Sequence, residues 1–348
     1  MTTATGARTA CAADTVLAMH WTPTTDPTTS EVVGLSITAR HTNGARLELE
    51  YGGARRLRVV NVGVPVLWAR VEGLYAGVWV VRPRGSSALG LLPPIRADEA
   101  RAMHTSLDCM KWVAAALTRS TTPLRSGEWQ LSDLQPVEAT LRDRARGHTA
   151  DVLRSRDPNE QPAPAYGLQS AFSVPHAHFE DWGMNGSGAV LPLRDPSEPD
   201  AARVKSWCKH ARDGTLPPVV LWWVSALDMY VLLDGHDRLQ AANAEGVPTR
   251  ALALWQGHED AIDDAAWRAG LVRRYERAFE AGERLSVRTR LELNHSLVEA
   301  FRGYRRVRTR ALARYRLNAE WEGQVRAELA DEPALARRVC GLPPGLPG

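Results

Sequence analysis

Apolar and polar residues alternate along the N-terminal quarter of the chain, from residue 31 to about residue 82. The segment Val33–Ile37 shows the pattern, in which every second residue is apolar, and similar short runs follow it. A period of two is typical of strands that bury one face. Asn43-Gly44 and Gly52-Gly53 separate the runs, and both pairs favour hairpin turns because they tolerate positive φ. The pattern predicts about five antiparallel strands packed as a small β-sandwich or barrel.

After Pro93-Pro94 the apolar residues recur with the period of a helix. Residues 97–119 place apolar side chains on one helical face, and residues 120–165 combine short polar helical pieces with turn residues, ending in a linker over 154–165. Strands and helices then alternate. The expected strands cover 190–193, 218–224, 230–233 and 250–255, and the expected helices cover 199–212 and 238–245. Long helical patterns follow at 261–283 and 287–329.

These patterns predict an α+β multidomain protein with an N-terminal antiparallel β domain, a central α/β domain and a C-terminal helical extension. The expected boundaries, in chain order, are a flexible N-terminus at 1–12, a β-sandwich or barrel-like domain at 13–96, a helical connector and linker at 97–165, the central α/β domain at 166–256, the helical extension at 257–335 and a tail at 336–348.

Composition narrows the class of protein. The chain has 348 residues, of which 44% are hydrophobic and 24% charged, values typical of folded globular proteins. We expect a soluble, cytoplasmic protein, since no apolar run approaches the roughly 20 residues that span a bilayer and the N-terminus lacks the apolar stretch of a signal peptide. The four cysteines are far apart and suggest neither a disulfide framework nor a zinc ribbon. A net charge of +3 is too small for nucleic-acid binding by the whole surface, but it leaves room for a local basic patch.

The segment that carries chemistry is the turn from Asp234 to Arg238, where an apolar strand leads into an Ala-rich helix. Backbone N–H groups at such a turn favour an anion, to which Arg238 would add a bidentate fork and His236 a second donor. A purely structural interpretation is equally open: Asp234 caps the helix, Gly235 makes the turn and Arg238 pairs with a surface carboxylate.

Three stretches resemble elements of the ParB/sulfiredoxin superfamily, in that family's order, over roughly residues 190–255. Leu193–Trp207 is similar to its loop and first helix, Leu216–Trp223 to its Pro-Pro-apolar strand, and Leu233–Arg238 to its phosphate-binding turn. The resemblance implies that residues 166–256 form a nucleotide-binding domain.

The turn distinguishes the branches of the superfamily. His236 stands where sulfiredoxins carry a catalytic cysteine, which argues against sulfinic acid reduction. Partition proteins resemble this turn with a Gly-Glu-Arg-Arg type sequence, whereas free-serine kinases read Asp-Gly-His-His-Arg and are closer to this chain. Asp237 replaces their second histidine. Because a carboxylate repels phosphate unless a Mg²⁺ ion lies between them, this departure either argues against phosphate binding at the turn or makes it depend on a Mg²⁺ ion at Asp237.

The resemblance to free-serine kinases also implies roles for individual residues. A carboxylate in the loop before the first helix would act as general base, and Asp195, Glu198 and Asp200 are the candidates, with Glu198 nearest by alignment. The alternative is that Glu198 or Asp200 only stabilises the helix N-terminus. Asp234 is a further catalytic candidate. The other residues implied to contact the nucleotide and its phosphates are Gly235, His236, Asp237, Arg238, Arg203, Ser206 and His210.

We therefore expect nucleotide-dependent phosphoryl chemistry at the turn from Asp234 to Arg238, as a small-molecule kinase or an ATPase. The implied cofactors are ATP or another nucleotide and Mg²⁺, and the implied partner is a small-molecule acceptor. The alternative is a non-catalytic, nucleotide-gated module of the ParB-like type that binds DNA or a protein partner.

Two further clusters of side chains suggest ligand binding, one of a metal and one of nucleic acid, and each also has a purely structural interpretation. His176, His178 and Glu180 project from one side of an extended segment, a workable metal geometry, although such histidine pairs are common in loops. A predicted helix at 301–316 carries arginines that could grip nucleic-acid phosphates, or could form an ordinary solvated face beside nearby glutamates. The arginines expected to contact nucleic acid are Arg302, Arg305, Arg306 and Arg310.

Overall fold

The computed structural model describes most of the chain. The described residues are 18–25, 30–40, 47–72, 77–85, 92–120, 124–134, 167–182, 188–256, 269–270, 272–273, 275–277 and 309–342. The predicted turn at Asn43-Gly44, the predicted linker at 154–165 and three of the candidate nucleic-acid contacts, Arg302, Arg305 and Arg306, lie outside these residues.

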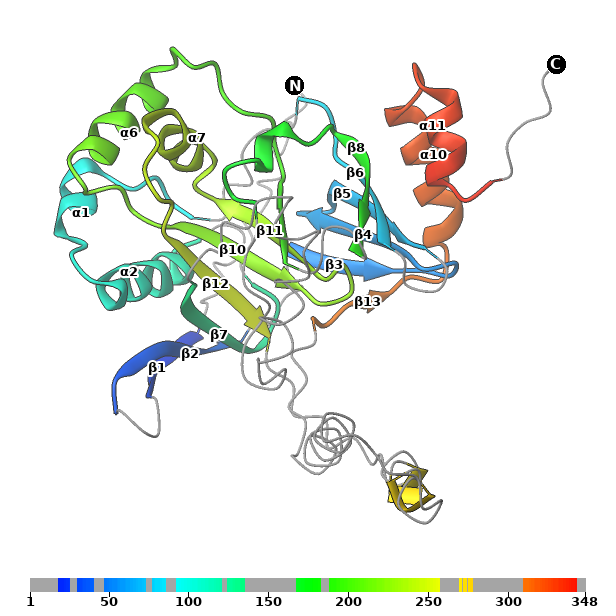
Figure 1. Cartoon of the computed structure of the whole chain (residues 1–348), viewed down its shortest axis with the longest axis horizontal. Coiled ribbons are helices and arrows are strands. Elements are labelled where there is room, and N and C mark those ends of the chain that lie inside the picture. Colours follow the sequence, from blue (N-terminus) through cyan, green and yellow to red (C-terminus); the bar gives the residue numbers. More distant parts are fainter. Residues whose placement is uncertain are drawn as a thin grey trace, which may run out of the picture.

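Two mixed sheets form the centre of the molecule, so the fold is α+β as predicted (Figure 1). Sheet A has the order β1 (Ala18–Thr25), β2 (Val32–Arg40), β7 (Gly127–Leu134), β12 (Ala251–Gln256), β10 (Val219–Val224), β11 (Met229–Asp234), β9 (Ala189–Pro192). Sheet B has the order β13 (Leu312–Ala313), β3 (Leu47–Tyr51), β4 (Arg56–Asn61), β5 (Val64–Val71), β6 (Gly77–Val81), β8 (Ala177–Asp181). The pairs β10–β12, β9–β11 and β3–β13 are parallel, and the other described pairs are antiparallel.

Helices cover the sheets on several sides. They are α1 (Ala97–Ala102), α2 (Ser106–Thr118), α6 (Ala202–Arg212), α7 (His236–Glu245), α10 (Leu317–Glu328) and α11 (Pro333–Val339). Figure 1 shows α6 and α7 at one end of the molecule and α10 and α11 at the other. Within the described ranges, no helix has the length and apolarity needed to cross a membrane.

Alternation along β10 explains how the centre of sheet A is buried on both faces. Val220 and Trp222 join the large core that also contains α2 and the inner face of sheet B. Val219 and Leu221 point the other way and join the cluster that includes Leu239 of α7. Because successive side chains of a strand face opposite sides, a continuous apolar run such as this one fits a strand covered on both faces.

The outer face of sheet B is covered by α10 and α11. Trp68 and Trp79 on the sheet pack with the fully buried Trp321 of α10. Arginines on the same face reach the two helices. Arg58 donates to Glu320 Oε1 at 2.6 Å, and Arg70 Nε donates to the carbonyl oxygen of Val339, in the last turn of α11, at 2.5 Å. The arginines therefore hold the helix pair at its acidic side chains and at a helix C-terminus, where positive charge is favourable.

The predicted domain boundaries do not separate the two sheets. Strands β1 and β2, expected in the N-terminal β domain at 13–96, lie in sheet A beside β7 and β12. Strand β8, expected in the central domain at 166–256, pairs with β6 in sheet B. Alternation marks which residues are strands, but it carries no information about which distant strand each one joins.

Several local predictions also need correction between residues 97 and 165. The single helix expected over 97–119 is broken into α1 and α2, because Thr105 is extended and caps α2, accepting from the Asp108 N–H at 3.1 Å. The helical connector expected at 97–165 contains a central strand of sheet A, β7. Trp129 and Leu131 are buried on one face of β7, so its alternation is present in the sequence.

The hairpin between β3 and β4 turns two residues later than predicted. The residues with positive φ are Ala54 (55°) and Arg55 (57°), rather than Gly52-Gly53. The glycines instead allow α10 to approach. A Cβ atom on Gly52 would lie 2.8 Å from Asn318 Oδ1, and one on Gly53 would lie 2.7 Å from Asn318 Nδ2.

The C-terminal predictions are wrong in two places. Residues 309–316 contain β13 and a turn instead of the end of a long helix, and the Arg310 N–H donates to Gln256 Oε1 at 2.8 Å. The tail expected from residue 336 begins inside α11, whose Ala336 and Val339 are buried against sheet B. The apolar residues of this segment have a helical period, but Leu312 and Ala313 pair with Glu50 and Tyr51 of β3 and form a strand instead.

Candidate functional site

The predicted strand–turn–helix at Asp234–Arg238 is confirmed. Strand β11 ends at Asp234, α7 begins at His236, and Gly235 between them has φ 97° and ψ 22°. A Cβ atom here would lie 2.9 Å from Val219 Cγ1 and 2.8 Å from Arg238 Nη2. Glycine is therefore required twice, for its left-handed backbone and for the close approach of its neighbours.

Arg238 points into the protein beneath the turn. Its side chain is 2% exposed, and Nη2 donates to Asp234 Oδ2 at 2.8 Å and to the Pro218 carbonyl oxygen at 3.1 Å. The guanidinium also lies over the ring of Trp207, 5.8 Å from its centroid. Asp234, the proposed catalytic acid, is thus the partner of Arg238, and the two residues brace the turn from inside.

His236 is buried as well. Its Nε2 accepts a hydrogen bond from the Leu193 N–H at 3.2 Å, so this nitrogen carries no proton. Burial, reinforced by the charge of Arg194, lowers the pKa of His236 to about 3. The imidazole is therefore neutral at physiological pH and fastens the end of β9 to α7, so Nε2 is not a phosphate donor.

Asp237 organises the loop between β9 and α6. Its Oδ1 accepts from Arg194 Nη2 at 2.5 Å and from Ser197 Oγ at 2.7 Å, while Oδ2 lies 3.2 Å from Arg203 Nε. Burial would raise the pKa of Asp237, but the bonds from Arg194 and Ser197 and the charge of Arg203 outweigh it and hold the pKa below its usual range.

The donor set at Asp237 does not fit the Mg²⁺ ion implied by the resemblance. Both carboxylate oxygens face cationic or hydroxyl donors, namely Arg194, Ser197 and Arg203. Among the described residues, no group of three or more His, Cys, Asp or Glu side chains is placed to hold a metal.

The loop acids fall into two kinds. Asp195 Oδ1 lies 3.5 Å from Nη2 of the buried Arg82. Glu198 and Asp200 are exposed, and neither has an ion-pair partner in the described part of the chain. Glu198 and Asp200 are thus both accessible to a ligand, and no ion pair with a described residue fixes either carboxylate.

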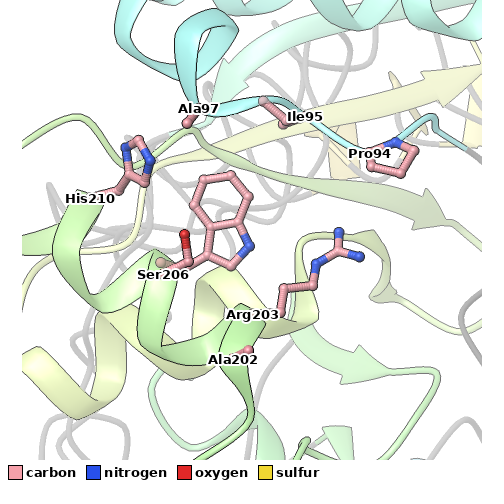
Figure 2. Close-up of a pocket in the computed structure, with 8 residues that line it drawn as sticks. Pro94, Ile95, Ala97, Ala202, Arg203, Ser206 and His210 are labelled. Atoms are coloured by element: carbon pink, nitrogen blue, oxygen red, sulfur yellow. The ribbon is translucent and has the colours of Figure 1, made fainter.

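The three α6 residues implied to contact the nucleotide do share a cavity. Arg203, Ser206 and His210 line a pocket of about 400 Å³ between α6 and the segment that precedes α1. Figure 2 shows these side chains on one wall and Pro94 and Ile95 on the opposite wall. Spacings of three and four residues place the three polar side chains on one helical face.

Aromatic surface completes the pocket. Trp207 lines it, and its ring centroid is 5.2 Å from that of His210. His210 Nδ1 lies 2.9 Å from Thr215 Oγ1, and burial, with a smaller contribution from the charge of Arg101, lowers the pKa of His210. The imidazole is consequently neutral at pH 7 and offers a ring surface and one polar nitrogen rather than a charge.

Sequence reasoning misses the second wall of this pocket. The pattern places Pro94, Ile95 and Ala97 at a domain boundary and a helix start, and it gives Trp207 no role at a site. The Pro93-Pro94 pair is the available signal, since it fixes an extended approach to α1, but a single sequence does not show that this segment faces α6.

The candidate metal ligands lie on β8 and just before it, and they do not form a metal-binding group among the described residues. His178 Nδ1 donates to the Pro175 carbonyl oxygen at 3.1 Å, and its Nε2 is 3.9 Å from Glu180 Oε2. His176 Nε2 instead accepts from Arg84 Nε at 3.1 Å. Burial lowers the pKa of His178 to about 4, so it too is neutral at physiological pH.

Comparison with known proteins gave no match to the chain among family models, curated proteins or solved structures.

Proposed function

We propose that the protein is a nucleotide-binding protein and that the nucleotide lies in the α6 pocket rather than on the Asp234–Arg238 turn. The observation that carries the proposal is the joint placement of Arg203, Ser206 and His210 around one cavity of about 400 Å³. Small-molecule sites typically have volumes of about 300 to 1,000 Å³ and combine apolar walls with a few convergent polar groups.

The chemistry of the walls suits the parts of a nucleotide. Trp207 and His210 are each 5% exposed, so their rings offer a base a limited aromatic contact at one wall, and Ile95 provides apolar surface opposite. Arg203 is half exposed, and Asp237 engages only its Nε. Its terminal nitrogens are thereby left for a phosphate, which a planar guanidinium binds in bidentate fashion.

The turn has a supporting role in this proposal. Asp237 positions Arg203 and Arg194, and Arg238 packs behind Trp207. The aspartate that replaces the second histidine of the kinase-like turn would then act as an anchor for cations that face the ligand, and it would not need a metal ion. This interpretation accounts for a carboxylate in a turn that otherwise resembles a phosphate-binding one.

Calorimetry with ATP, ADP and CTP, with and without Mg²⁺, tests the proposal. Arg203→Ala should weaken nucleotide binding roughly tenfold to a hundredfold, as expected for removal of a charged hydrogen bond. Arg212→Ala is the matched control, because Arg212 lies on the same helix with similar exposure and pairs with Glu245 outside the pocket. Equal affinities of the two variants for every nucleotide would overturn the assignment.

Phosphoryl transfer is the second candidate, favoured by the unpaired Glu198. Its carboxylate would take the proton from an acceptor hydroxyl as that oxygen attacks the γ-phosphorus and the nucleoside diphosphate leaves. Glu198→Gln should then leave nucleotide affinity nearly intact and lower turnover by roughly 10² to 10⁴. Wild-type protein that turns over no nucleotide, with water or with any hydroxylated acceptor, would leave only the binding function.

Nucleic-acid binding through the arginines near residue 305 stays a prediction, since Arg310 is the one candidate inside the described ranges. Replacing Arg305, Arg306 and Arg310 together should reduce the salt dependence of DNA binding by about one unit of slope for each phosphate that the variant no longer neutralises.

A further inference from the structure

Arg82 lies at the junction of the two sheets, next to the candidate site but outside the α6 pocket. It directly follows β6 of sheet B, and its backbone N–H donates to the His176 carbonyl oxygen at 2.8 Å. Its guanidinium extends toward the loop after β9, where Asp195 lies. The side chain is only 4% exposed.

The guanidinium of Arg82 is poorly satisfied for so buried a cation. Its Nη2 is 3.4 Å from the Val174 carbonyl oxygen and 3.5 Å from Asp195 Oδ1, and its Nε has no hydrogen-bond partner among the described residues. Both distances are long for a charged hydrogen bond, which is typically about 2.7 to 2.9 Å. An arginine has five N–H donors, and the contacts of Arg82 with the described residues involve only Nη2 of its guanidinium nitrogens.

Other buried arginines in the same protein make shorter hydrogen bonds. Arg58 donates to Glu50 at 2.6 Å, to Glu320 at 2.6 Å and to Gln324 at 3.0 Å. Arg238 also leaves its Nε without a partner, yet it makes a bond of 2.8 Å to Asp234. Arg82 makes no comparable short bond to any residue that the structure describes, although burying a cation is costly unless it is well paired.

The surroundings of Arg82 carry an excess of positive charge. Within the described residues, Arg82 pairs with the carboxylate of Asp195, Arg194 and Arg203 pair with that of Asp237, and no further carboxylate is paired with the three arginines. The nearby imidazole of His236 is neutral, so it adds no charge, and its low pKa reflects burial first and the charges of Arg194 and Arg82 after it. A small anion would therefore find both donors and a favourable field.

Asp195 has the properties of a group that a ligand can replace. Its side chain is 56% exposed, it lies on an external loop, and its contact with Arg82 is 3.5 Å. The neighbouring acid, Asp237, is by contrast buried and held by three partners.

We propose that Arg82 is the centre of a second ligand site, which takes the oxyanion of a small molecule, a carboxylate or a phosphate group, in place of Asp195. The ligand oxygens accept from the Arg82 guanidinium, and the Asp195 side chain moves into solvent. No bond is made or broken. The site is separate from the α6 pocket and does not depend on nucleotide binding there.

Calorimetric titration of the full chain with inorganic phosphate and with acetate, at constant ionic strength and without nucleotide, tests this site. Asp195→Asn removes the competing carboxylate and should tighten binding of the preferred anion about two- to fivefold, the range set by removal of a partly exposed ion pair. Arg82→Gln should weaken it at least about tenfold. Arg203 adds its charge to the field but no donor to the site, so Arg203→Ala should weaken binding by no more than about threefold, which separates this site from the nucleotide pocket.

Each outcome decides the matter. Tighter binding by Asp195→Asn supports the site even if Arg82→Gln fails to fold, and the preferred anion then identifies a phosphorylated or a carboxylated ligand. Unchanged or weaker binding by Asp195→Asn overturns the proposal, as does the absence of binding of either anion to the wild type. Loss of binding in Arg203→Ala also overturns it, because the anion then occupies the α6 pocket.

Discussion

Replacing Asp237 by asparagine tests whether this residue is an anchor or a metal ligand. The change keeps the size of the side chain and removes its charge. In the folded protein the carboxylate accepts from Arg194 at 2.5 Å and from Ser197 at 2.7 Å, and it pairs with Arg203 at 3.2 Å. Asparagine retains one acceptor oxygen and presents an N–H₂ group to at least one of these cationic donors.

The expected decrease in stability follows from the exposure of the partners. Removing one member of a fully buried ion pair costs about 3 to 5 kcal/mol. Arg194 is 15% exposed and Arg203 is 55% exposed, so water can partly replace the missing partner, most easily at Arg203. We therefore expect the free energy of unfolding to fall by about 2 to 3 kcal/mol, the upper part of the range for hydrogen bonds to charged groups.

Urea unfolding with and without Mg²⁺ measures the effect. The midpoint should fall with an unchanged slope, because the folded core is intact. Asp213→Asn is the control, since Asp213 is exposed at the end of α6 and its replacement should change stability by less than about 0.5 kcal/mol. The carboxylate contributes in full above the unfolded-state pKa of about 3.9. Its contribution disappears as the pH falls through the lowered folded-state pKa, so the two proteins should converge in acid.

Two results would refute the anchor role of Asp237. One is a variant as stable as the Asp213→Asn control. The other is a stabilisation of the wild type by Mg²⁺ that disappears in Asp237→Asn, which would make the residue a metal ligand after all.

Two further predictions concern the turn and its acid sensitivity. Gly235→Ala should lower the free energy of unfolding in urea by about 2 to 4 kcal/mol, because it combines positive φ with overlap at Val219 Cγ1. Gly214→Ala is the control: Gly214 has φ 67° and open space around it, so the loss should be at least about 1 kcal/mol smaller. Equal losses would mean that the neighbours of Gly235 move aside without cost. The folded-state pKa values of His236 (about 3) and His178 (about 4) lie below the unfolded value of about 6.5. The free energy of unfolding should therefore fall as the pH drops from about 6.5 toward 4, by up to about 1.4 kcal/mol per pH unit for each histidine. His178→Gln should reduce that slope, and an identical slope would contradict the burial of a neutral His178.

The α/β unit around the turn is predictable from the sequence, because its strands are continuous apolar runs and its helices have clear ends. The strand expected at 230–233 is β11 (Met229–Asp234), and the helix expected at 238–245 lies within α7. The left-handed Gly235 is likewise predictable, since only glycine makes so sharp a strand-to-helix turn without strain.

The assembly of the sheets cannot be predicted in the same way. Strand β7 has eight residues and alternates in the sequence, but its place in sheet A depends on pairing with β2 and β12, both far away in the sequence. The same holds for β13, a two-residue strand defined by its partner β3. Periodicity reports local burial, whereas these elements depend on non-local pairing.

The direction of the turn side chains is the main limit on predicting the site. Residue type suggests that His236, Asp237 and Arg238 face a phosphate, yet all three are buried and bonded to the protein. A helix turns its residues through about 100° per step, so a one-residue difference in where a helix starts decides which side chains face outward. The face of α6 is easier to predict, because spacings within one long helix fix it.

The place of β7 in sheet A has a consequence for how the protein is made. As the chain leaves the ribosome, β7 can pair at once with β2, but its other edge stays open until β12, which ends at Gln256, has been synthesised. Strands β9, β10 and β11 can join the sheet only through β12. A fragment that ends at residue 165 therefore exposes an unpaired strand edge, and a fragment that begins at residue 166 exposes the complementary edge of β12. Such edges template pairing with other chains, so the two fragments should aggregate when made singly and assemble with each other when made together in one cell.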